Sequence, residues 1–274
     1  MCLCPAHEDA TPSLSVRVGQ VSILFKCFAG CATSDVLRAL RDHKVTIPIG
    51  RRPQRWSGQN NADALMVARA ESIWREAGPL AGSLGERYLR ARGIVRLSTA
   101  LRFCPRTPIG RGRAVRFRPA LIAAIRLRDR IVAIQRIFLS DDPPSLATDM
   151  ARARLTLGRP LGGAVMLDRA GPVLGLAEGI ETALSATILL GIPVWATLGN
   201  ERLPAISLPS TVRRIVLLPD ADAPGRLAES RARLAYARAG REIRTVWPWY
   251  GLNDWNDVLQ SEGERAEGLV RRAA

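Results

Sequence analysis

Two closely spaced pairs of Cys and His side chains constrain the folding of this chain more than any other feature. The first pair is Cys4-Pro-Ala-His7, and the second, Cys27-Phe-Ala-Gly-Cys31, begins twenty positions after His7. Thiolate and imidazole ligands suit zinc, and the short spacing lets each pair bind from one turn. A hairpin's length separates the pairs, so we predict that all four side chains hold one tetrahedral Zn²⁺. The alternative is that they are ordinary core residues.

The expected cellular setting favours metal binding over disulfide formation. Residues 1–4 do not resemble a secretory signal, and no apolar run reaches the roughly 18 residues that a membrane-spanning helix needs. We therefore predict a cytoplasmic protein without a membrane partner, in a reducing compartment where disulfides are rare. Cys2 is interpreted as a spare thiol or an alternative ligand, and Cys104 as a core residue.

The residues around the four ligands resemble the zinc ribbon of bacterial and phage DNA primases. The shared features include Pro5, Thr11-Pro-Ser-Leu-Ser15 and Lys26-Cys27-Phe28. The resemblance implies that this segment helps to engage single-stranded template DNA, with Lys26 as a nucleic-acid contact. Because the first ligand is at position 4, we expect either a trimmed ribbon or a true N-terminus upstream of Met1.

The excess positive charge is concentrated in the middle of the chain. The net charge is +15, with a pI near 11.1. Residues 51–140 carry 19 basic and 5 acidic side chains, a net of +14, whereas residues 1–50 and 141–274 have net charges of +1 and 0. Such a segment suits a polyanion, so we predict that residues 51–140 contact nucleic acid. The alternative is a solvated Arg-rich surface, which is common.

The C-terminal part of the chain alternates between short apolar runs and helical segments. Strands with helices between them indicate a parallel sheet of the doubly wound type, which makes the fold class α/β. Pro224 and Gly240 stand where the start and the end of a helix favour these residues. The predicted strands are Val173–Ala177, Pro193–Thr197, Arg214–Leu218 and Glu242–Trp247, and the predicted helices are Glu181–Leu190 and Pro224–Ala239.

The remaining segments suggest three further regions. Helices are expected near Ser34–Asp42, around residues 65–74 and over Leu84–Ala91, and a hairpin pairs residues 120–126 with 131–138. Burial is expected for Trp74, while Trp56 is left undecided between burial and stacking on bases. The predicted domains are a zinc ribbon at 1–50, a basic helical linker region at 51–107, the N-terminal part of a catalytic core at 108–171, and the parallel-sheet domain at 172–262.

Acidic side chains follow the ends of the predicted parallel strands. Glu178 follows the first strand, Asp220 and Asp222 follow the third, and Asp254 and Asp257 lie in a late loop. The carboxyl ends of such strands meet at one edge of the sheet, so we expect the three clusters to converge. Clustered carboxylates repel one another and need a hard cation such as Mg²⁺ or Mn²⁺. Taken singly, Glu178 has a simpler interpretation as a turn residue and Asp222 as a helix cap.

This arrangement resembles the Toprim domain of primases, topoisomerases and some nucleases, over residues 172–260. The resemblance implies that Glu178 is the general acid/base or helps to bind magnesium, and that Asp220 and Asp222 are catalytic metal ligands. It also implies that Asp254 and Asp257 belong to the magnesium site. The catalytic residues are thus expected to be Glu178, Asp220 and Asp222.

Two positions depart from the Toprim pattern. Asn253 stands where the family has Lys, and Thr182 stands where many primases have a further Asp, with Glu181 beside it as a candidate substitute. The number of metal ions is therefore left open.

In primases the region between the ribbon and the Toprim domain binds template and nucleotide. By position, this implies nucleic-acid contacts for Arg136, Arg154 and Arg159. The Gly-rich segment 157–163 has two interpretations: a loop whose backbone amides approach phosphates, or a Gly-Pro turn that enters the next domain.

Together the resemblances imply a DNA primase that makes short primers from NTPs on a single-stranded DNA template, with Mg²⁺. The setting would be the replication of a phage, plasmid or integrated element, with a replicative helicase encoded elsewhere as a partner. The alternatives are a non-catalytic DNA-binding replication module and a Toprim nuclease. A fused helicase is excluded because neither Lys26 nor Lys44 follows Gly, as a P-loop requires. A topoisomerase is disfavoured because no Tyr has an evident nucleophile context.

Overall fold

The computed structural model of the chain describes residues 1–18, 23–42, 57–110, 112–237, 240–249 and 251–262. The backbone divides into two compact units, Met1–Arg55 and Trp56–Ala274, and each is described by itself. Trp56 and the first residues of the predicted linker region lie outside the described residues.

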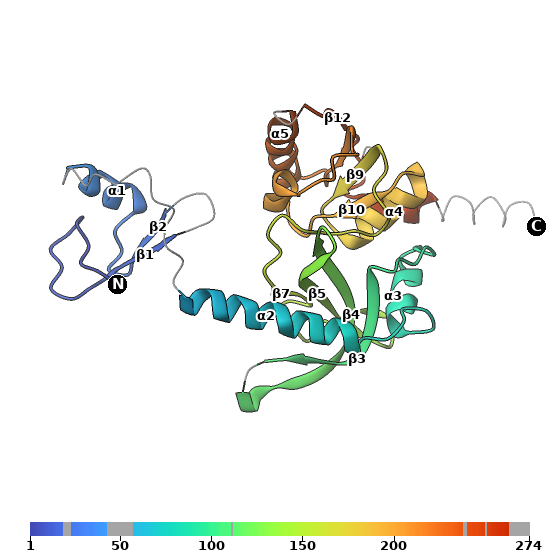
Figure 1. The fold of residues 1–274 in the computed structure, drawn as a ribbon, viewed down its shortest axis with the longest axis horizontal. Coiled ribbons are helices and arrows are strands. Elements are labelled where there is room, and N and C mark those ends of the chain that lie inside the picture. The colour runs from blue at the N-terminus through green and yellow to red at the C-terminus, as the bar shows by residue number, and fades with distance from the viewer. Residues whose placement is uncertain (19–22, 43–56, 111, 238–239, 250, 263–274) are drawn as a thin grey trace, which may run out of the picture. The chain divides into compact units, whose positions relative to one another are not determined.

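The N-terminal unit is a β-hairpin followed by a helix (Figure 1). β1 (Leu14–Val18) and β2 (Ile23–Cys27) pair antiparallel, and α1 (Thr33–Asp42) confirms the helix predicted there. The core of this unit is small, because its buried apolar members are Cys4, Leu14, Cys27 and Val36. A core of this size does not stabilise a segment of about 40 residues without a further cross-link.

The second unit is built on one ten-stranded sheet, and the C-terminal part of that sheet is parallel as predicted. Its strands are β9 (Val173–Ala177), β10 (Val194–Ala196), β11 (Arg214–Leu218) and β12 (Glu242–Thr245), in the order β12-β11-β9-β10. The chain leaves β9 for β10 on one side and later returns to place β11 on the other side. The strand order therefore reverses between β9 and β11, as in doubly wound folds.

Helices cover both faces of the parallel strands. α4 (Ile180–Leu190) shares a hydrophobic core with Val216 of β11, whereas α5 (Ala223–Ala237) shares a different core with Ile215 and Leu217. Successive side chains of a strand point to opposite faces, so these contacts place α4 and α5 on opposite sides of the sheet. Because both faces of the sheet are covered, β11 has apolar residues at consecutive positions instead of alternating apolar and polar residues.

The other part of the sheet is antiparallel and is built around the predicted hairpin. β4 (Arg116–Leu127) and β5 (Arg130–Ser140) form that hairpin, and both strands are longer than predicted. β3 (Leu101–Ile109), which was not predicted, pairs with β4 and runs across the predicted boundary at residue 107. Three short strands complete this part: β6 (Ser145–Leu146), β7 (Arg154–Gly158), and β8 (Ala164–Val165), which pairs with both β4 and β10.

Two helices pack on the antiparallel part. α2 (Ser57–Glu76) packs along β5 and β7 and buries Trp74, as predicted. α3 (Leu84–Ala91) begins at Ser83, whose hydroxyl accepts a hydrogen bond from the backbone N–H of Glu86. Both helices match expected positions, although α2 is longer.

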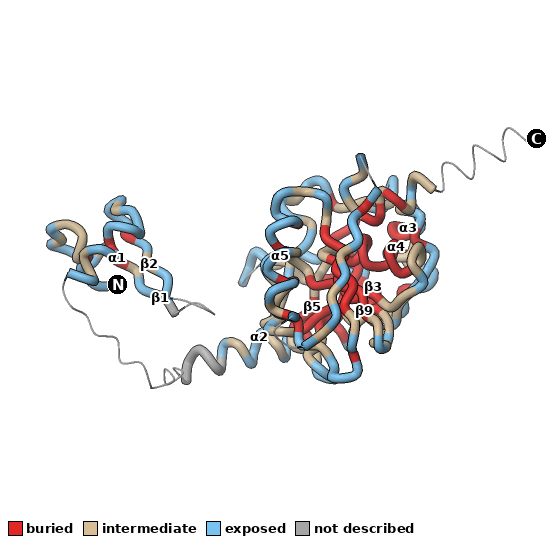
Figure 2. The backbone as a smooth tube through the Cα atoms, turned by 90° about the horizontal axis from the view of Figure 1, so that it is seen from above, coloured by how far each residue is buried: buried red, intermediate tan, exposed pale blue. Residues whose placement is uncertain are grey.

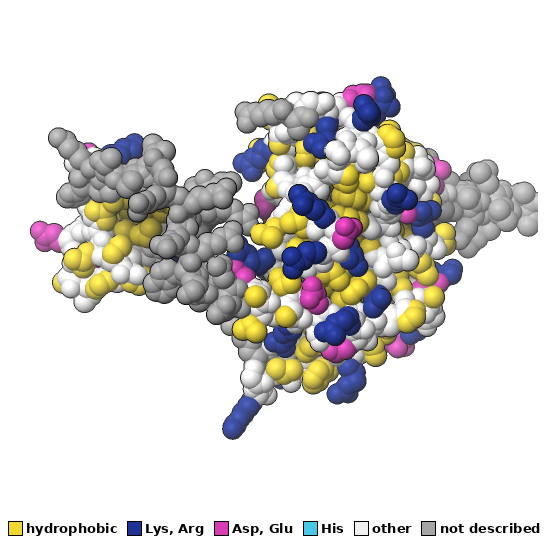
Figure 3. Space-filling view, in the orientation of Figure 1, with side chains coloured by type: hydrophobic (Ala, Val, Ile, Leu, Met, Phe, Trp, Pro, Cys, Tyr) yellow, Lys and Arg dark blue, Asp and Glu magenta, His cyan; other side chains and the backbone are white. Residues whose placement is uncertain are grey.

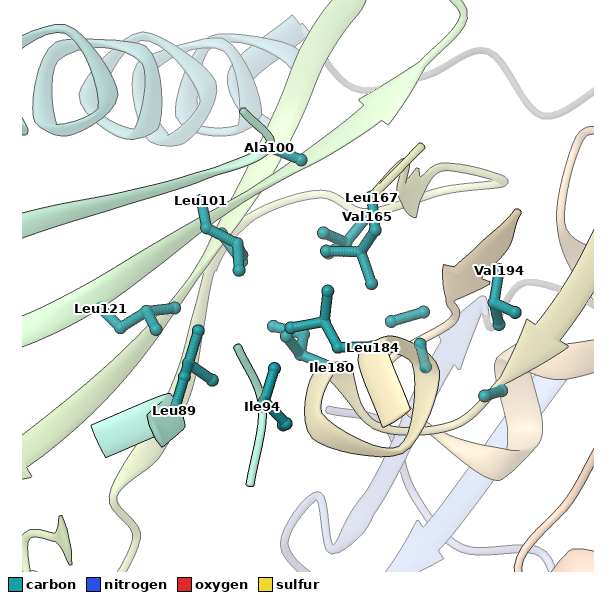
Figure 4. Close-up of a cluster of buried hydrophobic side chains, with 14 of the residues drawn as sticks. Leu89, Ile94, Ala100, Leu101, Leu121, Val165, Leu167, Ile180, Leu184 and Val194 are labelled. Atoms are coloured by element: carbon teal, nitrogen blue, oxygen red, sulfur yellow. The ribbon is translucent and has the colours of Figure 1, made fainter. Parts of the chain in front are cut away.

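The parallel and antiparallel parts share one hydrophobic core. Figure 4 shows Leu89 of α3, Leu121 of β4, Val165 of β8 and Leu184 of α4 converging in it. In Figure 2 the buried segments of this unit lie inside a shell of exposed loops and helix faces. Residues 57–107 thus supply helices and a strand to the body of the unit.

Two 3₁₀ helices, η1 (Gly112–Ala114) and η2 (Asn200–Ala205), and a helical segment at residues 255–262 complete the described elements. None of the helices that the structure describes has the length and apolarity needed to cross a bilayer.

Candidate metal centre and acidic cleft

The four predicted zinc ligands come together in the N-terminal unit. The ligand atoms of Cys4, His7, Cys27 and Cys31 all lie within 4.8 Å of one another, and Cys4 and Cys27 are buried. Nδ1 of His7 lies 3.2 Å from Sγ of Cys31. Three thiols and one imidazole gathered in this way could hold a tetrahedral Zn²⁺.

The carboxylate of Asp9 contacts two of the four proposed ligand residues, Cys4 and His7. One of its carboxylate oxygens accepts hydrogen bonds from the backbone N–H of Cys4 at 2.7 Å and from the hydroxyl of Ser13 at 2.7 Å. Its other oxygen lies 3.5 Å from Nε2 of His7. A carboxylate on the second ring nitrogen fixes the tautomer and orientation of a metal-binding His. Sequence analysis missed this role, because an acidic residue two positions after a His is too common to be a signal.

The thiols strongly affect one another's ionisation. Burial raises the pKa of Cys31 to about 11, and interactions with the neighbouring thiols of Cys27 and Cys4 act in the same direction. Burial also raises the pKa of Cys27, but hydrogen bonds from the backbone of Cys31 and from Ser13 outweigh it and lower that pKa to about 6. Adjacent thiolates repel one another, and a bound cation removes that repulsion.

The other two thiols have different surroundings. Cys2 is exposed, and its Sγ lies 3.6 Å from the carbonyl oxygen of Leu14, outside the four-ligand group. Cys104 is buried in the core beneath α2, as predicted.

The predicted acidic residues gather where the strand order of the parallel sheet reverses. Glu178 directly follows β9 and Asp220 follows β11, the two adjacent strands at the reversal. Ligands of open α/β sheets bind at such points. Glu178, Asp220 and Asp254 line one cleft of about 280 Å³. The topology of the sheet thus brings together carboxylates that are far apart in the sequence.

Burial and the charges of neighbouring carboxylates disfavour the charged forms of Asp220 and Glu178. Burial raises the pKa of Asp220 to about 7, and the charges of Glu178 and three further Asp side chains add to the increase. Burial also raises the pKa of Glu178, and the negative charges of Asp222 and Glu201 raise it further. Among the described residues, no three carboxylates are gathered as closely as the four zinc ligands, as expected of like charges.

One carboxylate oxygen of Asp220 is suited to binding a cation. The Oδ1 atom of Asp220 is buried and has no hydrogen-bond partner. A buried carboxylate oxygen without a donor or a countercharge is costly, and a divalent cation would remove that cost. Carboxylate oxygens are also the donors that Mg²⁺ and Mn²⁺ prefer, so the residues present fit such an ion.

Asp222 has one oxygen committed to the backbone. Its Oδ1 accepts a hydrogen bond of 2.6 Å from the N–H of Gly225, which confirms the helix-cap interpretation for this oxygen. Gly225 has no room for a side chain, because a Cβ there would lie 2.2 Å from the carbonyl oxygen of Asp220. The missing side chain lets the start of α5 close against the Asp220–Asp222 loop.

The late acidic pair forms a reciprocal cap at the start of the helical segment 255–262. Oδ1 of Asp254 accepts from the backbone N–H of Asp257 at 2.9 Å, and Oδ2 of Asp257 accepts from that of Asp254 at 3.3 Å. Asp254 also lines the acidic cleft, whereas Asp257 does not belong to its lining. The carbonyl oxygen of Asn253 accepts from the N–H of Ala221 at 2.7 Å, which ties this late loop to the Asp220–Asp222 loop.

Two arginines, Arg92 and Arg154, line the same cleft as the carboxylates. Arg154 donates to Oε1 of Glu181 at 2.6 Å, and the hydroxyl of Tyr88 donates to the same oxygen at 2.6 Å. Burial alone would raise the pKa of Glu181, but the charge of Arg154 and these hydrogen bonds lower it. Oε1 of Glu181 thus accepts hydrogen bonds from both Tyr88 and Arg154, and this ion pair holds Arg154 at the cleft.

The other predicted nucleic-acid contacts lie elsewhere. Lys26 is exposed in the N-terminal unit, with its Nζ 5.1 Å from the centre of the Phe28 ring. Arg136 donates to the carbonyl oxygen of Pro108 at 2.8 Å, and its neighbour Gln135 lines the acidic cleft instead. Arg159 pairs with Asp63 of α2. Arg92, which does line the cleft, was not predicted from the sequence.

The Gly-rich segment 157–163 forms a packed turn. A Cβ at Gly163 would lie 2.7 Å from the carbonyl oxygen of Arg126, and one at Gly162 would lie 2.5 Å from the hydroxyl of Ser207. Arg202 donates to the carbonyl oxygens of Leu161, at 3.1 Å, and of Gly163. These contacts favour the turn over the phosphate loop.

The fold offsets part of the positive charge of residues 51–140. Figure 3 shows Lys and Arg side chains spread over the visible face of the second unit, with acidic side chains among them. Three arginines of this segment pair with Asp residues from beyond position 140, which offsets part of the excess charge. The pairs are Arg87–Asp141, Arg96–Asp168 and Arg118–Asp149.

Comparison with known proteins agrees with this architecture. Residues 173–265 match the Toprim domain family, and residues 65–167 match a domain of unknown function (DUF7146). A search of the curated proteins gave no match.

Among the solved structures of similar fold are three primase fragments. The zinc-binding and RNA polymerase domains of the Aquifex aeolicus primase are 18% identical, with a TM-score of 0.51 over 98% of this chain and 76% of that one. A DNA primase domain from Pseudomonas aeruginosa is 18% identical, with a TM-score of 0.50 over 74% of this chain and 76% of that one. A DnaG primase catalytic domain bound to ssDNA is 17% identical, with a TM-score of 0.51 over 77% of this chain and 80% of that one.

Proposed function

We propose that this chain is a DNA primase, a template-directed nucleotidyltransferase of DNA replication. Two findings support the proposal: its C-terminal part is a Toprim domain, and the chain has the fold of primases. It makes short primers from NTPs on single-stranded DNA during replication of a phage, plasmid or integrated element. The observation that carries the proposal is the buried, unpartnered oxygen of Asp220 in a cleft lined by both carboxylates and arginines. Carboxylates for a divalent cation beside guanidinium groups for phosphates suit phosphoryl transfer.

In this proposal the acidic edge of the sheet holds Mg²⁺ or Mn²⁺. Glu178, Asp220 and Asp222 are its ligands, and Asp254 and Asp257 add negative charge around it. When bound, the ion stabilises charge on the transferred phosphoryl group and makes the 3′-hydroxyl more acidic. Glu178 accepts the proton of that hydroxyl while the hydroxyl oxygen bonds to the α-phosphorus of the NTP and pyrophosphate leaves.

The arginine side of the cleft binds the triphosphate. Arg154 is held in place by the buried carboxylate of Glu181, so its guanidinium needs little reorganisation to meet a phosphate. Arg92 approaches the same cleft from the end of α3. Arg136 and Arg159 do not belong to the lining of the cleft, so Arg92 and Arg154 are the preferred phosphate contacts.

The template and the partners complete the proposal. The DnaG catalytic domain of the same fold was solved bound to ssDNA, and we assign a single-stranded template to this chain. Lys26 of the zinc ribbon contacts that template, with an affinity that falls as salt rises. A replicative helicase encoded elsewhere is the expected partner, and the cytoplasm is the expected location.

Primer synthesis is the direct test. The full chain, loaded with zinc, is incubated with single-stranded DNA templates of mixed sequence, NTPs including one radiolabelled NTP, and Mg²⁺ or Mn²⁺. Short labelled products on a denaturing gel are the expected result, and none should form without template. Cleavage of the template instead would favour the nuclease alternative. DNA binding with no product on any template would favour the non-catalytic module.

Replacing Arg92 with Ala is expected to weaken NTP binding without unfolding the protein. A hydrogen bond to a charged group contributes about 1.5 to 3 kcal/mol, so the KM for NTPs should rise about ten-fold or more. Arg90→Ala is the matched control, because Arg90 is exposed and pairs with Glu86 on the surface of α3. An unchanged KM in the Arg92 variant would remove this residue from the proposed site.

A further inference from the structure

A second concave surface adjoins the acidic cleft, and the proposed chemistry leaves it unused. It is a groove of about 510 Å³, and Ala221 and Asn253 belong to its lining. Ala221 lies between Asp220 and Asp222, and Asn253 directly precedes Asp254. The hydrogen bond from the N–H of Ala221 to the carbonyl oxygen of Asn253 joins the two loops. The groove and the acidic cleft are therefore built from the same pair of loops.

Two large aromatic side chains are displayed in this groove. Trp247 and Trp249 both line it and are 38% and 43% exposed. They flank Pro248, which is buried and anchors the segment between β12 and the late loop. The other Trp residues in the described part of the chain, at positions 74, 195 and 255, are buried. Two exposed indoles in one groove are therefore a particular feature of this site, and contiguous exposed apolar surface often marks a binding site.

The charge of the groove is suited to an anion. Arg226 of α5 lines it, and its guanidinium donates to the carbonyl oxygen of Ala221 at 3.3 Å, which holds it beside the Asp220–Asp222 loop. Asp and Glu are absent from the described lining of the groove, in contrast to the acidic cleft. Aromatic faces beside a basic side chain are the features with which proteins bind single-stranded nucleic acid.

We infer that this groove binds a nucleotide, with its base stacked on Trp247 or Trp249 and its phosphate paired with Arg226. The inference rests on the proposed function and deepens it, because a base held here lies next to the loop that carries Asp220 and Asp222. The nucleobase could belong to the template strand or to a free NTP. The two sources share the same chemistry, and binding experiments with each of them separate the two.

The test compares variants of the full, zinc-loaded chain. The first is the double variant Trp247→Ala with Trp249→Ala, and the second replaces both residues with Phe, which keeps an aromatic face. Phe117→Ala is the matched control, because its ring is 53% exposed but does not line the groove. Equal thermal unfolding midpoints for the three variants and the wild type exclude a loss of fold.

Two probes report on the two sources of the base. The first is fluorescence anisotropy of a labelled oligo-dT strand, and the second is equilibrium dialysis with radiolabelled ATP and Mg²⁺. If the base belongs to a strand, the double Ala variant should bind oligo-dT at least ten-fold more weakly, whereas the Phe variant and the control stay within about three-fold of the wild type. A comparable loss of ATP binding alone would assign the groove to the NTP. If neither probe changes, the inference is wrong.

Failure of this inference can be distinguished from failure of the proposed function. Both probes measure binding, and neither needs primer synthesis. A wild type that binds oligo-dT through the two Trp residues but makes no primer supports the groove and contradicts the primase. Equal rates of primer synthesis by the wild type and by the double Ala variant would support the primase and contradict the groove.

Discussion

Replacing Asp220 with Asn is expected to lower primer synthesis by about 10² to 10³-fold, because a metal contact of this kind contributes several kcal/mol to the transition state. In buffer without Mg²⁺, the same change should stabilise the fold. The wild-type carboxylate is buried, has an oxygen without a partner and is repelled by its neighbours, and a neutral amide has no charge to repel. A loss of activity with a gain of stability is the signature of a residue kept for binding a cation.

The pH dependence of stability follows from the raised pKa of Asp220. In the folded protein this pKa is about 7, whereas the ordinary value is 3.8. Between these two pH values the unfolded chain has lost the proton and the folded chain still holds it. The folded state therefore binds more protons, and the stability of the wild type falls as pH rises from about 4 to 7. The advantage of Asp220→Asn should grow over that range, to roughly 2 to 4 kcal/mol, and then level off.

Urea unfolding at several pH values, with and without Mg²⁺, measures these effects. Added Mg²⁺ should stabilise the wild type but not Asp220→Asn, because a ligand stabilises only the state that binds it. Asp129→Asn is the matched control, since Asp129 is exposed in the turn between β4 and β5 and should change neither activity nor stability. Wild-type rates of primer synthesis by Asp220→Asn would contradict the proposed metal site.

The acidic side of the cleft could be predicted because its signals are local. Val173–Ala177 is a run of apolar residues with Glu178 directly after it, and the apolar run at residues 215–218 is followed, after Pro219, by Asp220. The topology then brings these acidic residues together, because the carboxyl ends of adjacent parallel strands lie at one edge of the sheet. The zinc ligands were predictable for a similar reason, since each pair is close in sequence and one hairpin joins the pairs.

The basic side of the cleft could be predicted only in part: Arg154 was among the expected nucleic-acid contacts, whereas Arg92 was not, because its place in the cleft depends on contacts between distant segments. Arg154 reaches the cleft through the pairing of β7 with β5, and the buried Glu181 of α4 then holds it there. Sequence analysis chose Arg136, yet its neighbour Gln135 lines the cleft. A strand's side chains alternate between faces, so an unknown register leaves such a choice open. The groove beside Trp247 was missed because the segment between β12 and the late loop has no periodic pattern.

Replacing Cys27 with Ser is expected to unfold the N-terminal unit while leaving the second unit folded. A structural zinc site contributes on the order of 10 kcal/mol that is coupled to folding. The buried apolar core of this unit is small, and Cys4 and Cys27, two of the proposed ligands, belong to it. Loss of one ligand therefore removes both the metal and part of the core. All four ligands come from the N-terminal unit, so β4 and β5 should be unaffected.

Hydrogen exchange with mass spectrometry on the full chain resolves the two units. In Cys27→Ser the amides of β1 and β2 should exchange at nearly unprotected rates, and zinc content should fall from one ion per chain to none. Cys2→Ser is the matched control, because the Cys2 thiol lies outside the ligand group and donates to the carbonyl oxygen of Leu14. It should keep both the zinc and the protection. A Cys27→Ser hairpin that stays protected without zinc would mean that the fold of this unit does not depend on the metal.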